Sequence, residues 1–354
     1  MYYKKESGKV HGPSRRTELS ELGEFGLIDR LTTDIRSYHP ETLKGVGDDA
    51  AVIDAGNKLI LLSTDLLIEG IHFDLTYMPF RHLGYKAAVV NISDIAAMNG
   101  IPGQMTVSIA VSNRFPAEVL DEMYAGILLA CEKYRVDLVG GDTSSSPRGL
   151  MISVSILGET TREEIVYRNG AKPGDLLCVT GDLGSAYLGL LILEREKKVF
   201  RVNPEMQPEL TGFDYLLGRQ LKPEARTDIH NLLNDIGVKP TSMIDISDGL
   251  ASEILHLCKQ SGVGCKLYEE KIPIDDQTRQ LAMDYKIIPS VAALSGGEDY
   301  ELLFTVSQSD YEKIKGTGDI SIIGHMTNAP EGKFMITPDG QSIPLTAQGW
   351  DGFK

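Results

Sequence analysis

The stretch RHLGYKAAVVNISDIAAMNG, residues 81–100, is the part of the sequence that decides the fold. Its apolar residues recur at helical spacing, and four residues fall on one stripe: Ala87, Asn91, Asp94 and Met98. Asp94 therefore shares a helix face with Asn91. Because an aspartate inside an otherwise apolar helix costs free energy unless it is paired, solvent or a buried metal ion must satisfy it. We expect a helix here that carries a functional carboxylate.

Asp94 is one of seven aspartates that stand beside Gly, Ser, Thr or a second Asp at the end of an apolar run. They are Asp48 and Asp49 in GVGDDAAVI, Asp65 in STDLL, Asp94 in NISDIAAM, Asp142 in GGDTS, and Asp245 and Asp248 in MIDISDGL. Taken singly, each is equally well an N-cap or a turn residue. If they converge, however, their mutual repulsion excludes a fully ionised site without metal. Since Mg²⁺ bound by a few carboxylates completes its coordination with water and phosphate, the set predicts a phosphate-handling site with several metal ions.

Composition favours a globular protein of two domains. Of its residues, 42% are hydrophobic and 24% are charged, as in globular proteins. Its length of 354 residues exceeds the size at which a single core keeps growing. No apolar run approaches the roughly 18 residues that span a bilayer, and the N-terminus has no apolar stretch typical of a secretory signal. The four cysteines show neither CxxC spacing nor a disulfide framework. We expect a cytoplasmic protein with free thiols and no membrane partner.

The formal net charge of -15 argues against a nucleic-acid partner. Phosphate backbones are bound by clustered Lys and Arg, and the sequence has no such block. An anionic ligand must therefore be neutralised locally, by metal ions or by a few placed cations. Most of the excess negative charge is assigned to ordinary solubilising surface.

The order of predicted elements indicates an α+β or α/β protein of two domains. Strands and helices alternate, but several strands are adjacent along the chain, which disfavours a purely doubly wound sheet. The predicted division is a flexible N-terminal arm over 1–18, a first domain over 19–168 and a second over 169–354, with the Gly- and Pro-bearing GAKPGDLL at the junction. The stretch from Glu194 to Lys222 has weak periodicity and is predicted to be an extended insertion.

The usual nucleotide-binding motifs are missing, since the chain has neither a P-loop nor a complete GxGxxG. If it binds ATP, the Gly140–Gly141 turn of GGDT suits close approach to phosphate, with Asp142 able to ligate a bridging metal ion. Arg168 and Lys172 are the best-placed cations for a triphosphate, although a solvated junction explains them equally well. No Ser-His-Asp or Cys-His arrangement is recognisable, so nucleophilic catalysis is not expected.

Three further residues are candidates for substrate contact, each with a structural alternative. His72 in EGIHF is more often a structural histidine. Glu298 in GGEDYELLF could orient a cationic substrate or cap its turn. Trp350, the only tryptophan, could stack on a ligand ring or cover the core.

Taken in order, these segments resemble the thiamine-monophosphate kinase family. The resemblance runs from about Glu24 to the C-terminus and rests on seven motifs: GVGDDAAVI, STDLLIEGIHF, GYKAAVVNISDIAAMNG, VGGDTSSSP, RNGAKPGD, IDISDGL and SGGEDYELLF. It implies the PurM-like fold of aminoimidazole ribonucleotide synthetase, with an N-terminal domain whose sheet pairs across a homodimer and a C-terminal α/β domain. It also implies ATP-dependent conversion of thiamine monophosphate to thiamine diphosphate.

The resemblance also implies roles for residues at matching positions. The implied Mg²⁺ ligands are Asp48, Ser63, Thr64, Asp65, Asp94, Asp142, Asp245 and Asp248, of which Asp94 and Asp245 are taken as catalytic. The implied ATP contacts are Gly141, Asp142, Arg168 and Ser247, and the implied thiamine contacts are His72, Glu298 and Trp350. One departure concerns the C-terminal element, where Gly352 replaces the usual His.

The implied chemistry agrees with the residues present. A phosphate monoester has its second pKa at about 6, so the acceptor is already a nucleophilic dianion and needs no general base. Bringing it onto an anionic donor requires charge neutralisation, which divalent ions between the two supply. Another synthetase of the same superfamily, and a non-catalytic nucleotide- or thiamine-phosphate-binding protein, remain as alternatives.

Overall fold

The computed structural model describes residues 17–347. Residues 17–36 and residues 37–347 belong to two compact units, which are described separately. The first contains the helix α1 (Leu19–Thr32), which is kinked at Gly23, where φ is 63°. The predicted arm lies outside the described residues except for its last two, and so does Trp350.

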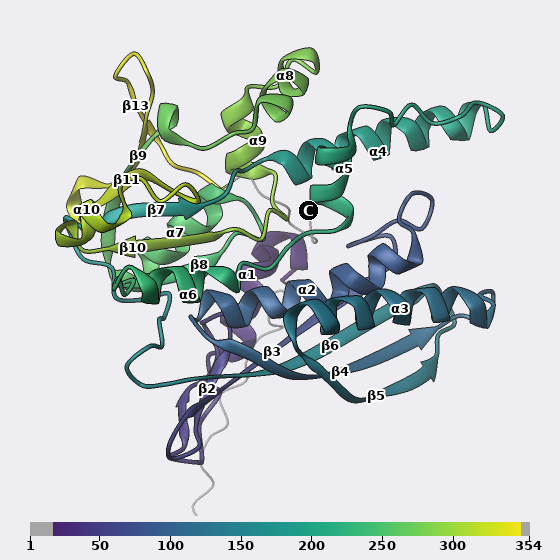
Figure 1. Cartoon of the computed structure of the whole chain (residues 1–354), viewed down its shortest axis with the longest axis horizontal. Coiled ribbons are helices and arrows are strands. Elements are labelled where there is room, and N and C mark those ends of the chain that lie inside the picture. Colours follow the sequence, from purple (N-terminus) through teal and green to yellow (C-terminus); the bar gives the residue numbers. More distant parts are fainter. Residues whose placement is uncertain (1–16, 348–354) are drawn as a thin grey trace, which may run out of the picture. The chain divides into compact units, whose positions relative to one another are not determined.

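The second unit begins with a six-stranded mixed sheet formed by residues 42–160, in the order β1-β2-β3-β6-β4-β5 (Figure 1). Its strands are β1 (Thr42–Lys44), β2 (Ala51–Asp54), β3 (Leu59–Ile68), β4 (Ile101–Val111), β5 (Asp137–Ser145) and β6 (Leu150–Thr160). The β4–β5 pair is parallel and the other pairs are antiparallel.

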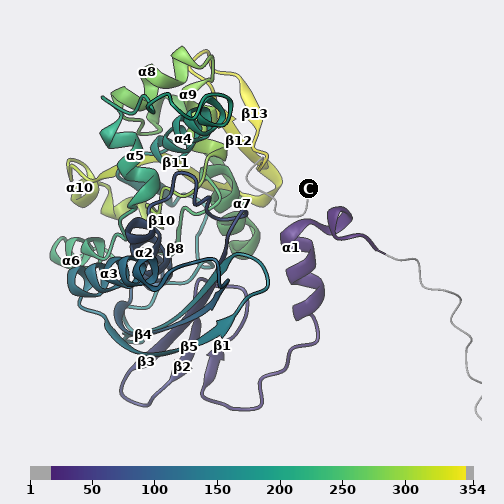
Figure 2. The ribbon, with the colours of Figure 1, turned by 90° about the vertical axis from the view of Figure 1, so that its right-hand side faces the viewer.

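Two helices, α2 (Phe80–Ala97) and α3 (Ala117–Tyr134), lie on the same face of this first sheet (Figures 1 and 2). Strand β3 alternates accordingly, because successive side chains of a strand point to opposite faces. Leu59, Leu61 and Leu67 are buried on the helix side, whereas Leu62 and Leu66 are exposed on the other. Among residues 37–347, helices therefore cover only one face of this sheet.

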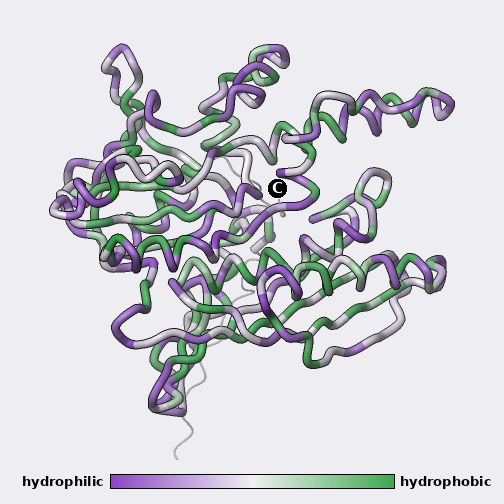
Figure 3. Tube along the Cα trace, viewed as in Figure 1, coloured by the Kyte–Doolittle hydropathy of each residue, from purple (hydrophilic) through white to green (hydrophobic). Residues whose placement is uncertain are grey.

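A second mixed sheet is formed by residues 176–344, in the order β13-β12-β9-β11-β7-β10-β8. Its strands are β7 (Leu176–Thr180), β8 (Ser242–Asp245), β9 (Val263–Tyr268), β10 (Leu302–Val306), β11 (Ile320–Asn328), β12 (Lys333–Ile336) and β13 (Ser342–Pro344). The β9–β12 pair is parallel. Hydrophobic stretches run along strands of both sheets (Figure 3).

Helices cover both faces of the second sheet. One core cluster joins the strands to α7 (Leu250–Ser261) and α9 (Pro289–Ser295). Another joins them to α6 (Asp228–Asp235) and α10 (Tyr311–Ile314), and includes Ala97 at the end of α2. The remaining helices, α4 (Ser185–Val202), α5 (Asp214–Leu221) and α8 (Asp276–Asp284), share a smaller apolar cluster.

These observations confirm a two-domain α/β protein with two mixed sheets. The prediction of an extended insertion from Glu194 to Lys222 is wrong, because α4 continues to Val202 and α5 follows. The apolar periodicity is weak in the sequence because residues 194–198 are all charged, and some of these groups pair with one another, such as Lys197 with Glu194.

Within the described residues, no helix combines the length and the apolar character needed to cross a membrane.

Helices α2 and α3 approach closely at two glycines. A Cβ on Gly84 would lie 1.9 Å from the carbonyl oxygen of Met123, and one on Gly126 would lie 1.9 Å from that of Arg81. Atoms do not approach to such distances, so any side chain at either position forces the helices apart. This contact fixes α2, which carries Asp94, against its neighbour.

We predict that Gly126→Ala lowers the free energy of unfolding by about 2–3 kcal/mol, because overpacking a close contact costs roughly this much. Gly218→Ala in α5 is the matched control, since no atom lies within 4 Å of its added Cβ. There the gain in helix propensity should stabilise the protein by up to about 1 kcal/mol. Urea unfolding measures both, and equal effects of the two substitutions would contradict the close-packing argument.

Candidate active site

Three carboxylates remote in sequence meet between the two sheets' domains. Asp49, Asp94 and Asp245 each offer an oxygen atom, and these atoms lie within 4.8 Å of one another. Asp49 precedes β2, Asp94 lies in α2 and Asp245 ends β8. Asp49 and Asp245 are buried and Asp94 is partly exposed. This is the only such group found among residues 17–347.

Hydroxyl groups on both sides orient two of these carboxylates. The Ser63 hydroxyl donates to Asp94 Oδ2, and the Ser93 hydroxyl donates to Asp245 Oδ2 at 2.6 Å. Ser63 reaches Asp94 because the alternation of β3 points it toward α2. Ser93 precedes Asp94 in the same helix. One turn of α2 therefore carries a carboxylate of the cluster and also holds Asp245, which comes from the second domain.

Arg168 holds the third carboxylate. Its Nε and Nη2 donate to the two oxygens of Asp49 at 3.1 and 2.7 Å, and its backbone N–H donates to Asp48 Oδ1 at 3.0 Å. Such a bidentate pair fixes both orientation and charge. Lys44 lies 3.5 Å from the other oxygen of Asp48. Arg168 therefore joins the cluster through Asp49, which still has free lone pairs for a metal ion.

The electrostatics show that the cluster is short of positive charge. Burial, followed by the charge of Asp49, raises the pKa of Asp245 to about 7. Burial, followed by Asp65 and then Asp245, raises the pKa of Asp94 well above its ordinary value. Burial also raises the pKa of Asp48 and of Asp65 to about 6 each. Because the charged forms are disfavoured without a further cation, this donor set fits divalent metal ions.

The GGEDYE turn approaches the same region. The backbone N–H of Glu298 donates to the carbonyl oxygen of Ser247 at 2.7 Å. Tyr300 is buried, and burial together with the nearby charges of Glu298 and Asp65 raises its pKa well above its ordinary value. The turn that carries Glu298 is thus bonded to the chain that directly follows Asp245.

Ser247 and Asp248 form the turn that follows β8. The buried Glu253 carboxylate accepts from their backbone N–H groups at 3.2 and 2.8 Å. Burial, followed by the charge of Asp248, raises the pKa of Glu253 to about 8. Ser247 itself is exposed, and its hydroxyl lies 3.5 Å from Glu253 Oε1.

Three predicted residues, Thr64, Gly141 and Asp142, lie outside the cluster of carboxylates. The Thr64 hydroxyl donates to the carbonyl oxygen of Val154 on the opposite face of the first sheet. Gly141 and Asp142 lie on the exposed edge strand β5. Gly141 is sterically required, since its Cβ would lie 1.9 Å from the Val107 carbonyl oxygen. Asp142 pairs with Ser108 on the outer face of the sheet, away from α2.

His72 lies on an exposed turn after β3, where its Nδ1 accepts from the backbone N–H of Ile68 at 2.9 Å. Because Nδ1 is the acceptor in this bond, it carries no proton there. Trp350 lies outside the described residues.

Sequence reasoning left three site residues out. Asp49 was noted among the seven aspartates but not assigned as a ligand. Two more, Lys86 and Gln220, contact Glu298 directly. A lysine at residue 86 of an otherwise apolar helix is a signal of the same kind as Asp94, because a buried charge requires a partner. Gln220 offered no comparable signal.

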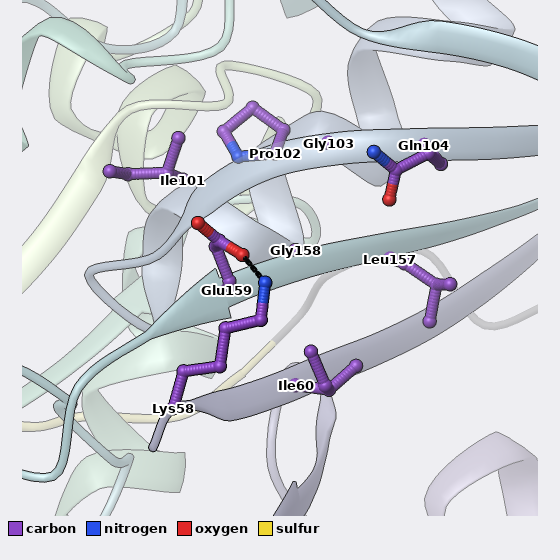
Figure 4. Close-up of a pocket in the computed structure, with 9 residues that line it drawn as sticks. All are labelled: Lys58, Ile60, Ile101, Pro102, Gly103, Gln104, Leu157, Gly158 and Glu159. Carbon is purple, nitrogen blue, oxygen red and sulfur yellow. Dashed lines mark hydrogen bonds and ion pairs between the residues drawn. The ribbon is translucent and has the colours of Figure 1, made fainter. Parts of the chain in front are cut away.

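A small cavity on the first sheet is separate from this site (Figure 4). It is lined by residues of β3, β4 and β6, and Lys58 pairs with Glu159 at its edge. None of the predicted site residues lines it.

The sequence matches two family descriptions in succession. Residues 47–160 match "AIR synthase related protein, N-terminal domain", and residues 172–337 match "AIR synthase related protein, C-terminal domain".

Curated relatives extend the similarity over almost the whole chain. The thiamine-monophosphate kinase of Bacillus subtilis is 35% identical over 94% of this chain and 100% of its own length. That of Escherichia coli strain K12 is 34% identical over 94% of this chain and 98% of its own.

Solved structures agree. One described as AaThiL complexed with AMPPCP and TMP has a TM-score of 0.82 at 34% identity and covers 96% of this chain and 99% of that chain. A crystal structure of thiamine monophosphate kinase from Aquifex aeolicus has a TM-score of 0.74 at 32% identity, covering 93% and 100%. The identities and coverage place this chain, with its two PurM-like domains, in the thiamine-monophosphate kinase family of AIR synthase-related proteins.

Proposed function

We propose that the protein transfers the γ-phosphoryl group of ATP directly to thiamine monophosphate, giving thiamine diphosphate. The observation that carries this proposal is the convergence of Asp49, Asp94 and Asp245 in one cluster of mostly buried carboxylates. A relative of 34% identity is described in complex with AMPPCP, an ATP analogue, and TMP. In this proposal the acidic residues bind the metal ions that neutralise the two phosphate groups, and Glu298 contacts the thiamine part of the acceptor.

The proposal requires no general base. The acceptor is a phosphate monoester whose second pKa is about 6, so it is an anionic nucleophile at neutral pH. Bound Mg²⁺ would supply charge neutralisation between the donor and acceptor phosphates. The chain contributes position: Ser63 and Ser93 orient the carboxylates of Asp94 and Asp245, and Arg168 fixes Asp49. In-line transfer follows when both substrates are held at near-attack distance.

The rival in a different class is a protein that binds the same ligands without turnover. ADP release that requires both thiamine monophosphate and Mg²⁺ distinguishes the kinase from this rival. The cluster favours the kinase, because three carboxylates without enough neighbouring positive charge are costly to bury. A protein that only binds the two ligands does not need to meet this cost at the place proposed for the phosphates.

We predict that Asp94→Asn and Asp245→Asn each lower kcat by at least about a hundredfold, because each removes one charge from the proposed metal site. Asp121→Asn on the exposed face of α3 is the matched control and should retain full activity. Circular dichroism checks that the fold is intact. Near-normal turnover of either site variant at saturating Mg²⁺ would count against the assignment.

The raised pKa values predict a pH-dependent stability of the metal-free protein. Asp245 has a pKa of about 7 in the folded state against 3.8 ordinarily, so the folded state binds the extra proton. Its contribution to stability is complete below pH 4 and is lost as the pH rises through 7. Mg²⁺ should therefore raise Tm more at pH 8 than at pH 5. At a free Mg²⁺ concentration of 100 times its Kd, the free energy of unfolding should rise by about 2.7 kcal/mol.

Thermal unfolding at both pH values, with Mg²⁺ and with EDTA, measures this effect. Asp245→Asn is the comparison, because it removes the titrating group and should flatten the pH dependence. A stabilisation by Mg²⁺ that is equal at pH 5 and pH 8 would refute the coupling.

We further propose that the protein acts as a homodimer through the uncovered face of the first sheet. Four large apolar residues are exposed on that face: Leu62, Leu66, Met151 and Leu157. A contiguous apolar face of this kind favours association with a second copy. Asp142 lies on the same face, three strands from Thr64 and thus about 14 Å away. Asp142 also points away from α2, which carries Asp94, so a site that uses both carboxylates must take them from different subunits.

Subunit mixing tests this arrangement. Asp94→Asn and Asp142→Asn should each be nearly inactive alone, but a mixed dimer should contain one site with both residues intact. After subunit exchange, activity should reach on the order of a quarter of wild type. If Asp142 served the site of its own subunit, mixing would restore nothing. Leu66→Asp should in addition shift the protein to a monomer in analytical ultracentrifugation.

A further inference from the structure

Glu298 is held by two side chains from outside its own turn. Its Oε1 lies 2.7 Å from Lys86 Nζ, and its Oε2 accepts from Gln220 Nε2 at 2.7 Å. Lys86 belongs to α2 and Gln220 to α5. We propose that Lys86 and Gln220 are positioning residues that fix the Glu298 carboxylate as the hydrogen-bond acceptor for the thiamine part of the acceptor. This inference rests on the proposed function.

Lys86 is buried to a degree that requires a defined partner. Its side chain is only 2% exposed, and it lies in the middle of the apolar packing of α2. Beyond Glu298, its ammonium group donates to the carbonyl oxygen of Gln220 at 3.3 Å. A buried ammonium without partners is strongly destabilising, so Lys86 determines where the Glu298 carboxylate can lie.

Gln220 brings the end of α5 onto the same turn. It is buried, and the preceding Arg219 donates to Glu301 Oε1 at 2.9 Å and lies 3.8 Å from Asp299. Helix α5 thus contacts all three acidic residues of the GGEDYE turn, which are Glu298, Asp299 and Glu301. This gives the segment between α4 and α6 a function: it carries Gln220 and Arg219 to the substrate turn.

The backbone at Glu298 explains why such support is needed. Its φ is 58°, a left-handed conformation that is costly for a residue other than glycine or asparagine. The preceding Gly297 has a φ of 70°, and a Cβ there would lie 2.6 Å from the Ser247 carbonyl oxygen. The main chain of the turn is therefore pressed against Ser247, and the side chain is fixed separately by Lys86 and Gln220.

The pairing also changes what Glu298 offers to a ligand. A carboxylate has about four acceptor positions, of which these two contacts use one on each oxygen. Lys86 compensates its charge, so Glu298 acts through directed hydrogen bonding more than through net charge. Thiamine carries an aminopyrimidine whose N–H groups are donors of the matching kind. Recognition should then depend on the orientation of Glu298, which is what Gln220 and Lys86 control.

The first test is Gln220→Leu, which removes the amide donor and keeps an apolar side chain of similar size. The KM for thiamine monophosphate should rise about tenfold, as expected for loss of a hydrogen bond to a charged group, while the KM for ATP stays within about twofold. Lys313→Met is the control, because it breaks a surface ion pair with Asp310 in the second domain and should change neither KM. Equal changes in both KM values, or none, would overturn the inference.

Lys86→Met tests the second contact but could also impair folding, because it leaves Glu298 without its cation. Two comparisons keep the test decisive. Lys86→Arg should recover part of the lost affinity for thiamine monophosphate. The double variant Lys86→Met/Glu298→Gln should bind thiamine monophosphate no more weakly than Glu298→Gln alone, since both act through one carboxylate. Additive losses would show that Lys86 has a purely structural role.

Calorimetric titration with thiamine monophosphate in the presence of AMPPCP separates this inference from the proposed function. If the wild-type protein binds thiamine monophosphate but produces no thiamine diphosphate, the proposed function fails. The inference then still predicts about tenfold weaker binding by Gln220→Leu. If the wild-type protein is an active kinase and Gln220→Leu binds normally, the inference alone fails.

Discussion

The repulsion between carboxylates is the constraint on which the rest of the structure depends. Asp94 and Asp245 come from different domains and lie within 4.8 Å of each other and of Asp49. In the absence of a further cation this arrangement opposes folding: burial first, and the neighbouring carboxylates second, raise the pKa values of Asp94 and Asp245. A fold that tolerates such a cluster must stabilise it by the surrounding packing, and the proposed function gives this cost a purpose, because divalent cations bound to phosphates would relieve it.

Helix α2 provides that packing. Its apolar surface is buried against the first sheet and α3, its Ser93 hydroxyl donates to Asp245, and Ala97 belongs to a core cluster of the second domain. The same helix carries Lys86 to Glu298. One element thus links the acidic cluster to the turn that carries Glu298. Since in-line transfer is sensitive to displacements of about 1 Å, this shared support has a direct catalytic consequence.

The two faces of the first sheet have different roles because strand side chains alternate. Ser63 and Asp65 point toward α2 and the acidic cluster, whereas Thr64 points to the uncovered face. Asp142 on β5 lies on that uncovered face as well. The period of two therefore separates residues that neighbour one another in sequence, and it explains why one chain alone does not collect every residue that the family resemblance implies.

The sequence by itself determined the fold class, most helices and strands, and the acidic residues as a group, because these follow from local periodicity and from small-residue turns after apolar runs. The last turns of the helix at residues 185–202 and the whole helix at 214–221 were missed, since the run of charged residues from Glu194 to Lys198 interrupts the apolar pattern. Only the tertiary structure decided that Asp49 joins Asp94 and Asp245, and that Lys86 and Gln220 meet at Glu298. Those contacts join residues up to 212 positions apart, and their distances are set by how the domains pack, which no local pattern encodes.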